Sequence, residues 1–266
     1  MFSSAKKVAF AAFVAIAAQT VSAISISSQC QSALVSVVTS SESSCLNAEA
    51  LAGLVVAGSN SSLISPLNSW LTGLCSQPEC TNSTLASLVN SVSSGCSSDL
   101  QSLGITANAS RLTQLVQEAY PTVRQVVCLA DTSDGNTLCV TETLTNVQKY
   151  VGPITASNVQ SIVSKALAGS LPDVPSNVTC TNCTRAALDI VNTNFPGLLS
   201  GGNSTISGQC GANFTSGAPP SSITQMANKA VASNTTSGAV FGASVPALGL
   251  AFSSLLVVFS AFAVLA

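Results

Sequence analysis

Apolar residues recur along the chain at spacings of three and four residues, which places them on one face of a helix. The spacing is clearest at Leu67, Trp70, Leu71 and Leu74. It recurs in the stretches 85–92, 112–120, 140–151, 159–167 and 187–191. The alternation typical of strands is scarce. The pattern predicts an all-α protein, a bundle of about eight short helices with four in each of two halves.

Helix boundaries are suggested by capping residues and prolines. Ser65 precedes Pro66 and is expected to cap the helix that carries Leu67. Asn108 or Ser110 is expected to cap the helix of residues 112–120. Pro121 is expected to end or kink that helix after Tyr120, because a proline in a helix interior removes a hydrogen bond.

The stretch 75–96 recurs in outline at 180–210. In each copy two close cysteines precede a threonine, an amphipathic run and a third cysteine. We equate Cys75, Cys80 and Cys96 with Cys180, Cys183 and Cys210, and Cys45 with Cys139. The match between Cys30 and Cys128 is weaker, because Cys30 opens an apolar run and Cys128 closes one. The chain is therefore predicted to contain two related halves, residues 24–100 and 101–212.

Residues 1–23 have the composition of a secretory signal peptide. Lys6 and Lys7 precede an uncharged apolar run too short to span a bilayer, and small residues follow at 21–23. We expect cleavage after Ala23. The alternative, a buried core helix, would need neither the two lysines before the apolar run nor the small residues after it.

Secretion decides how the cysteines are interpreted, because an even number in an oxidising compartment predicts disulfides. The ten are Cys30, Cys45, Cys75, Cys80, Cys96, Cys128, Cys139, Cys180, Cys183 and Cys210. Their spacing does not determine the connectivity. If each half holds five, at least one bridge must join the halves.

Composition excludes several classes of function. Charged residues make up only 7% of the chain, and no histidine is present. The Ser-His-Asp and Cys-His arrangements and the His-containing zinc sites are therefore excluded. After signal removal six basic and ten acidic residues remain, a net charge of −4. With no basic cluster, nucleic-acid binding is not expected.

Eight Asn-X-Ser/Thr sequons predict surface glycosylation on a secreted chain. They begin at Asn60, Asn82, Asn108, Asn177, Asn182, Asn203, Asn213 and Asn234. At Asn182 the middle residue is Cys183, so a disulfide would compete with glycan transfer there. Several of the eight are expected to be unoccupied.

Near the C-terminus the helical pattern gives way to a stretch rich in Gly, Ser, Pro and Thr, residues 213–237, which is predicted to be a stalk. Residues 238–266 end in an uninterrupted apolar tail, 247–266, with no Lys or Arg after it. This pattern predicts a glycosylphosphatidylinositol (GPI) anchor signal, with Asn234 or Ser237 as the acceptor. A retained membrane helix and a buried core helix are the alternatives.

Two motifs could carry chemistry, and both are better explained as structural. Cys180 and Cys183 form a CxxC, but no strand precedes it and the expected counterpart, Cys75 and Cys80, is spaced differently. Each of these cysteines is expected to bond elsewhere. Asp131 and Asp134 could hold calcium or act in hydrolysis, but DTSDGN lacks the ligand series of a calcium loop and predicts a turn. We predict no catalytic residue, cofactor or metal ligand.

The stretch Tyr120–Leu144, with YPTVRQVVCL followed by Asp131-Thr-Ser and TLCVTETL, resembles a fungal family of secreted, cysteine-rich helical proteins of unknown function, often with a predicted lipid anchor. The resemblance is fairly specific there and loose over the rest of Cys30 to Cys210. It implies a fungal cell-surface location. It supplies no catalytic residue.

Three functions remain open. The first is a non-enzymatic glycoprotein on the plasma membrane or cell wall, with contacts to wall polymers. The second is a helical binding module for an apolar ligand such as a lipid or sterol, which a large apolar cavity would favour. The third and weakest is a hydrolase based on carboxylates, whose candidate acids are Asp99, Glu118, Asp131, Glu142 and Asp189.

Overall fold

The computed structural model describes residues 27–51, 60–102, 104–159, 161–162, 174–196, 203–214 and 220–228. The signal peptide with its Ala23 cleavage site, the candidate anchor residues Asn234 and Ser237, and the hydrophobic tail lie outside these ranges. Helices contain 69% of the described residues, so the predicted, mostly helical fold is confirmed.

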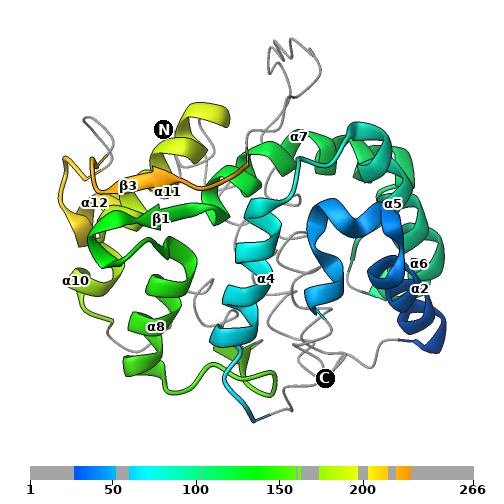
Figure 1. Cartoon of the computed structure of the whole chain (residues 1–266), viewed down its shortest axis with the longest axis horizontal. Coiled ribbons are helices and arrows are strands. Elements are labelled where there is room, and N and C mark those ends of the chain that lie inside the picture. Colours follow the sequence, from blue (N-terminus) through cyan, green and yellow to red (C-terminus); the bar gives the residue numbers. More distant parts are fainter. Residues whose placement is uncertain are drawn as a thin grey trace, which may run out of the picture.

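The longer helices are α2 (Ser28–Thr39), α4 (Ile64–Ser76), α5 (Asn82–Gly95), α7 (Ala109–Val127), α8 (Cys139–Val151) and α11 (Asn182–Asn194). The shorter ones are α6 (Ser97–Ser102), α10 (Ser176–Thr179), α12 (Asn203–Cys210) and the 3₁₀ turns η1 (Ser41–Leu46), η2 (Ala48–Leu51) and η3 (Thr132–Asp134). Helix α7 packs against α5, α11 and α4, and α2 packs against α5 (Figure 1).

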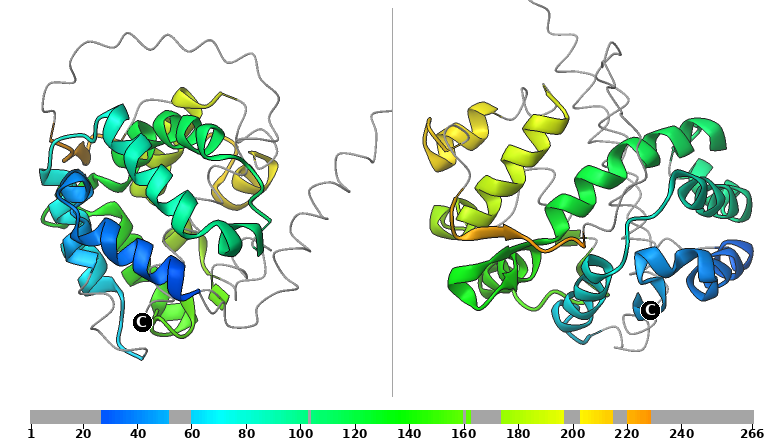
Figure 2. Two further views of the ribbon diagram at one scale, coloured as in Figure 1. Left: turned by 90° about the vertical axis from the view of Figure 1, so that its right-hand side faces the viewer. Right: turned by 45° about the horizontal axis from the view of Figure 1, so that its top comes forward.

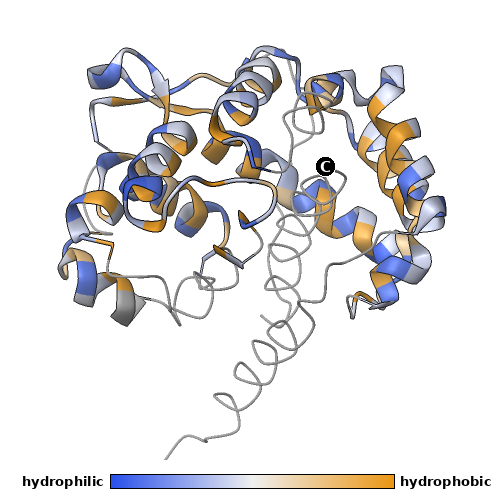
Figure 3. Ribbon diagram, turned by 90° about the horizontal axis from the view of Figure 1, so that it is seen from below, coloured by the Kyte–Doolittle hydropathy of each residue, from blue (hydrophilic) through white to orange (hydrophobic). Residues whose placement is uncertain are grey.

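The main core cluster lies where the two predicted halves meet. It combines Trp70, Leu71 and Leu74 of α4 with Ala48 and Leu51 of η2 and with two residues of the sheet, Ala130 and Leu138. The Trp70 indole nitrogen donates a hydrogen bond to the Leu46 carbonyl at 2.9 Å. The prediction that Trp70 belongs to the core is confirmed. Figure 3 shows hydrophobic residues gathered on the inward sides of the helices.

A small antiparallel sheet corrects the all-α prediction. Its strands are β1 (Leu129–Asp131), β2 (Thr137–Leu138) and β3 (Ile223–Gln225), in the order β2-β1-β3. Strands of two or three residues are too short to show alternation in the sequence. Moreover, β3 lies within the predicted stalk, 213–237. The structure places residues 220–228 in the fold, because β3 pairs with the whole of β1.

All ten predicted cysteines are bridged. The pairs are Cys30–Cys96, Cys45–Cys80, Cys75–Cys128, Cys139–Cys183 and Cys180–Cys210. Cys75–Cys128 joins the two predicted halves, as a count of five cysteines in each half requires. Cys180 and Cys183 bond to different partners, so the structural interpretation of the CxxC is confirmed.

Two helix starts carry the same kind of cap, in a register that differs from that of the predicted repeat. The Thr81 hydroxyl accepts from the backbone N–H of Thr84 at 3.1 Å, and the Thr181 hydroxyl accepts from that of Thr184 at 3.2 Å. These caps align Cys80 with Cys180. The helix starts therefore do not follow the predicted match of Cys80 with Cys183, because the N-caps rather than the cysteines define where each helix begins. The bridges Cys45–Cys80 and Cys139–Cys183 do follow that match.

Two boundary predictions were wrong. Helix α4 begins at Ile64, two residues earlier than a Ser65 cap predicts, because the preceding Leu63 N–H donates to the Ile154 carbonyl at 2.9 Å and fixes the chain there. Helix α7 continues through Pro121 to Val127. The Asn108 cap of α7 is confirmed, since its side chain accepts from the Arg111 N–H at 2.9 Å.

Three residues on one face of α7 hold the loop between α4 and α5. Cys128 is bonded to Cys75, Arg124 donates to the Gln77 carbonyl, and the Tyr120 hydroxyl accepts from the Cys80 N–H at 3.1 Å. These contacts lie on both sides of Pro121. They explain why the helix tolerates the proline, whose cost is roughly 3 kcal/mol.

Residues 225–228, here called the C-terminal strap, bind at the two residues of the Cys75–Cys128 bridge. Figure 2 shows in orange the strand β3 that leads into the strap. The N–H of Met226 donates to the Cys128 carbonyl and that of Asn228 to the Cys75 carbonyl, both at 2.8 Å. The carbonyls at a helix C-terminus have no partner within the helix. The strap therefore completes the hydrogen bonding at the ends of α4 and α7.

We expect the double variant Cys75→Ala/Cys128→Ala to lose about 4 kcal/mol of unfolding free energy, from the loop-entropy relation for residues 53 apart. Denaturant unfolding of the secreted protein measures this loss. Hydrogen exchange should also show faster exchange of the Met226 and Asn228 amides, because the bridge positions their acceptors.

The matched control is Cys180→Ala/Cys210→Ala, which removes a bridge whose cysteines are not the acceptors of the two strap amides. The two strap amides should stay protected in it. Equal deprotection in both variants would contradict the role assigned to Cys75–Cys128.

Candidate functional site

A polar hollow lies beside the N-terminal part of α8. It is lined by Asp134, Thr137, Glu142, Thr145, Asn146 and Lys149. Asp134 and Thr137 come from the loop and strand that precede α8, and the others lie on exposed turns of α8 itself. The Lys149 ammonium group donates to the Asn146 side-chain oxygen at 2.9 Å. The six lining side chains offer hydrogen-bonding and charged groups, and none of them is a hydrophobic residue.

Glu142 is the chemically distinctive residue of this hollow. Burial raises its pKa, and the negative charges of Asp131 and Asp134 raise it further. One carboxyl oxygen lies 3.2 Å from the Sγ atom of Cys183. A disulfide sulfur carries no hydrogen, so a hydrogen bond here needs the proton of the carboxyl group. The contact is therefore consistent with a carboxyl group that holds its proton unusually well.

The group formed by Cys139, Glu142 and Cys183 has the spacing of three metal ligands, within 4.8 Å of one another. Both cysteines are bonded to each other. Cysteine binds metals as the thiolate, which a disulfide sulfur cannot supply. The cluster is therefore a disulfide beside a carboxyl group, and it does not form a metal centre.

Asp131 and Asp134 lie in the turn that the sequence predicts. The Asp131 carboxylate accepts from the Ser133 N–H at 2.8 Å and from its hydroxyl at 2.6 Å. Gly135 and Asn136 both have φ values of 64°, in the left-handed region. The turn joins β1 to β2, and one Asp131 oxygen is already used within it.

The other carboxylates suggested for hydrolysis lie on separate elements. Asp99 is in α6, where its oxygens accept from the Ser27 N–H at 2.8 Å and the Ser27 hydroxyl at 2.7 Å. Glu118 is exposed on α7, and Asp189 lies on α11. The structure brings Asp131, Asp134 and Glu142 into one neighbourhood. Glu142 would have to serve as the acid in hydrolysis, and one of its carboxyl oxygens contacts the Cys139–Cys183 disulfide.

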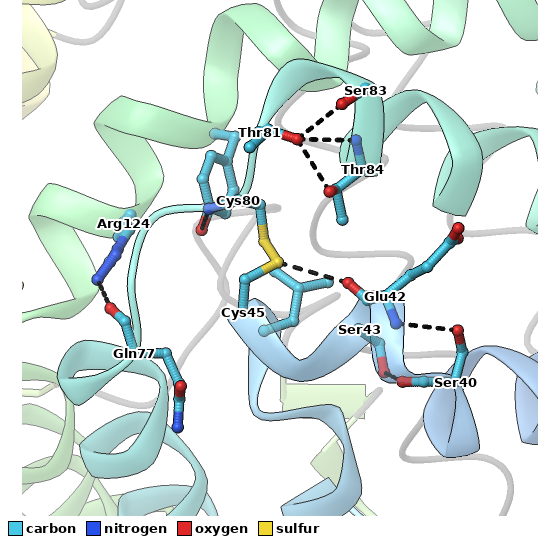
Figure 4. The surroundings of a disulfide bond; sticks show 12 residues. Ser40, Glu42, Ser43, Cys45, Gln77, Cys80, Thr81, Ser83, Thr84 and Arg124 are labelled. Carbon is cyan, nitrogen blue, oxygen red and sulfur yellow. Dashed lines mark hydrogen bonds between the residues drawn. A yellow bond between two sulfur atoms is a disulfide. The ribbon is translucent and has the colours of Figure 1, made fainter. Parts of the chain in front are cut away.

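Arg124 is the unusual residue that the sequence did not identify. It is only 4% exposed, and its Nε and Nη1 atoms are buried with no hydrogen-bond partner in the described part of the chain. The Nη2 atom donates to the carbonyl of Gln77, the C-cap of α4. Figure 4 shows this contact next to the Cys45–Cys80 bridge and the Thr81 cap.

The asparagines of the predicted sequons are accessible wherever the structure describes them. Asn60, Asn82, Asn108, Asn177, Asn182 and Asn213 are all exposed. The side chain of Asn203 and the whole of Asn234 lie outside the described residues. The Asn182 amide donates to the Ser222 hydroxyl at 3.3 Å, and a glycan would break this contact.

Comparisons with protein-family models, with curated proteins and with solved structures found no match to this chain. The resemblance to a fungal cysteine-rich family therefore stays a prediction. Among the described residues, no helix combines the length and the hydrophobicity needed to cross a membrane.

We expect Tyr120→Phe to lower the free energy of unfolding by about 1–3 kcal/mol, because it leaves the buried Cys80 N–H without an acceptor. Tyr150→Phe is the matched control. Tyr150 is 43% exposed, and its hydroxyl should contribute almost nothing. Denaturant unfolding compares the two. Similar losses in both variants would contradict the role of the Tyr120 hydroxyl.

Glu142→Gln should stabilise the protein at neutral pH. The raised pKa means that the folded state binds the proton more tightly than the unfolded state. The stability gained from this tighter proton binding is fully present below the ordinary carboxyl pKa. It is lost as the pH rises through the pKa of Glu142 in the folded state. The stabilisation by glutamine, which stays neutral, should therefore shrink as the pH falls. Denaturation midpoints from pH 3 to 8 measure this dependence.

Asp99→Asn should behave in the opposite way. Hydrogen bonds from Ser27 lower the pKa of Asp99, so its contribution is present above the ordinary carboxyl pKa and is lost as the pH falls. The variant should be less stable than the parent at neutral pH and equal to it in acid. A pH-independent effect of both substitutions would refute these assignments.

Proposed function

We propose that the protein is a non-enzymatic cell-surface glycoprotein, held by a GPI anchor on the plasma membrane or passed to the cell wall. The observation that carries the proposal is the complete pairing of ten cysteines, since no free cysteine remains. Five disulfides indicate an oxidising environment, which is that of secreted proteins. The exposed sequon asparagines support a glycosylated surface.

The low charge of the chain fits the same proposal. Only 7% of residues are charged, so glycans would supply much of the solubility that charges give other proteins. The apolar stretch 247–266, preceded by small residues around Asn234 and Ser237, supports an anchor signal.

Two other functions receive less support. A binding module for an apolar ligand needs a cavity with apolar walls, and the hollow beside α8 has polar ones. A hydrolase needs a carboxyl pair that faces a substrate. In the described part of the chain the perturbed carboxyl group, Glu142, is directed in part at the Cys139–Cys183 bridge.

Phospholipase C specific for phosphatidylinositol should release the full-length protein from intact membranes. The matched control is Asn234→Trp/Ser237→Trp, because an anchor acceptor must be small. That variant should not be released by the enzyme. Recovery of the parent only with detergent, with peptides from 247–266 still present, would show a retained membrane helix and contradict the anchor.

A further inference from the structure

We infer that the face of the domain formed by the C-terminal strap lies against the outer leaflet of the membrane that carries the anchor. This inference rests on the proposed anchor and adds the orientation of the domain. It begins from Asn228, the last residue that the structure describes before the candidate anchor residues, which lies inside the stalk predicted from the sequence.

The strap is fixed to the ends of two helices by both backbone and side chains. The backbone N–H groups of Met226 and Asn228 donate to the carbonyls of Cys128 and Cys75. The Gln225 side chain donates to the Gln125 carbonyl at 2.8 Å. The Asn228 side chain donates to the Ser76 carbonyl at 3.0 Å. Antiparallel pairing of β3 with β1 holds the preceding residues. The chain is thus tied to the fold as far as Asn228.

The remaining tether is short. Asn234 lies only six positions after Asn228, and Ser237 lies nine positions after it. Fully extended, these lengths span at most about 20 Å and about 30 Å. A flexible chain of the same length has a root-mean-square span of about 12–18 Å.

The domain is wider than this tether. A chain of about 200 residues has a radius of gyration of roughly 16 Å, so opposite faces are roughly 40 Å apart. An anchor attached at Asn234 or Ser237 would therefore keep the strap closer to the lipid surface than most of the domain.

The chemistry of the strap suits a lipid surface. Met226 is 47% exposed and is one of three large hydrophobic side chains exposed among the described residues. Its exposed neighbours Ser76, Gln125 and Asn228 are polar and uncharged. The side-chain amides of Gln125 and Asn228 can donate to lipid phosphates and to the glycan of the anchor, while no exposed charge among these three residues has to be desolvated.

Hydroxyl-radical footprinting with mass spectrometry can test this orientation on the full-length protein in its membrane. Met226 is a clean reporter, because the only other methionine in the chain is Met1. We expect oxidation of Met226 to be at least about threefold lower in the anchored protein than after phospholipase release.

Tyr150 is the internal reference. It lies near the end of α8, a helix that starts beside the sheet and is about 20 Å long. Its oxidation should be the same before and after release. Insertion of a 20-residue Gly/Ser linker between Asn228 and Lys229 should raise Met226 oxidation in the anchored protein to the released level.

The outcomes separate the two proposals. Release by phospholipase with equal Met226 oxidation before and after would overturn the orientation and leave the anchor intact. If Met226 oxidation stays low in the anchored protein with the long linker, the orientation is overturned too, since something other than the nearby membrane would then cover the strap. Failure of phospholipase to release the protein would refute the anchor, and the orientation with it.

Discussion

The attachment of the loop between α4 and α5 to one face of α7 is the constraint on which the rest of the structure depends. Tyr120, Arg124 and Cys128 are spaced by four residues, so they lie in a row along the helix. Each contacts a different position of the segment Cys75–Cys80. The helix therefore sets the path of this segment, and with it the direction in which α5 leaves. The same row positions the two carbonyls to which the strap binds.

Arg124 shows why this arrangement is stable despite an apparent cost. A buried guanidinium group with unpartnered nitrogens is normally expensive. Here the helices α4 and α7 both end near it, and a helix C-terminus carries partial negative charge. The bond to the Gln77 carbonyl adds a charge-assisted contact at one of these ends. The combined field of the two helix ends offsets part of the desolvation of the arginine without a carboxylate.

The sequence predicted those features that depend on local patterns. Helices with long amphipathic stripes, the Asn108 cap and the Asp-Gly turn were all visible, because each is specified by neighbouring residues. Features that depend on distant contacts were not. The continuation of α7 through Pro121, the burial of Arg124 and the pairing of β3 with β1 are determined by segments up to about a hundred residues away.

The repeat illustrates the same limit. The cysteine spacing suggested which cysteines are equivalent but not which are bonded, and one pair of bridges, Cys45–Cys80 and Cys139–Cys183, joins equivalent cysteines. The other bridges do not, because a disulfide depends on which sulfur atoms meet in space. Among the candidate functional residues, Glu142 could be listed from the sequence as an acid. Its raised pKa could not, because the burial and the nearby Asp131 and Asp134 come from the fold.

The placement of the bridges explains how a chain with few large side chains keeps several separate elements folded. The main cluster around Trp70 contains no cysteine. Each of the smaller clusters contains a bridge: Cys30–Cys96 beside Leu34, Cys139–Cys183 beside Leu129, and Cys80 beside Leu85. Such clusters bury too little apolar area to offset the entropy of ordering their helices. The disulfide lowers that entropy cost. These three bridges therefore stabilise the smaller clusters, whereas the packing around Trp70 and the Cys75–Cys128 bridge join the two halves.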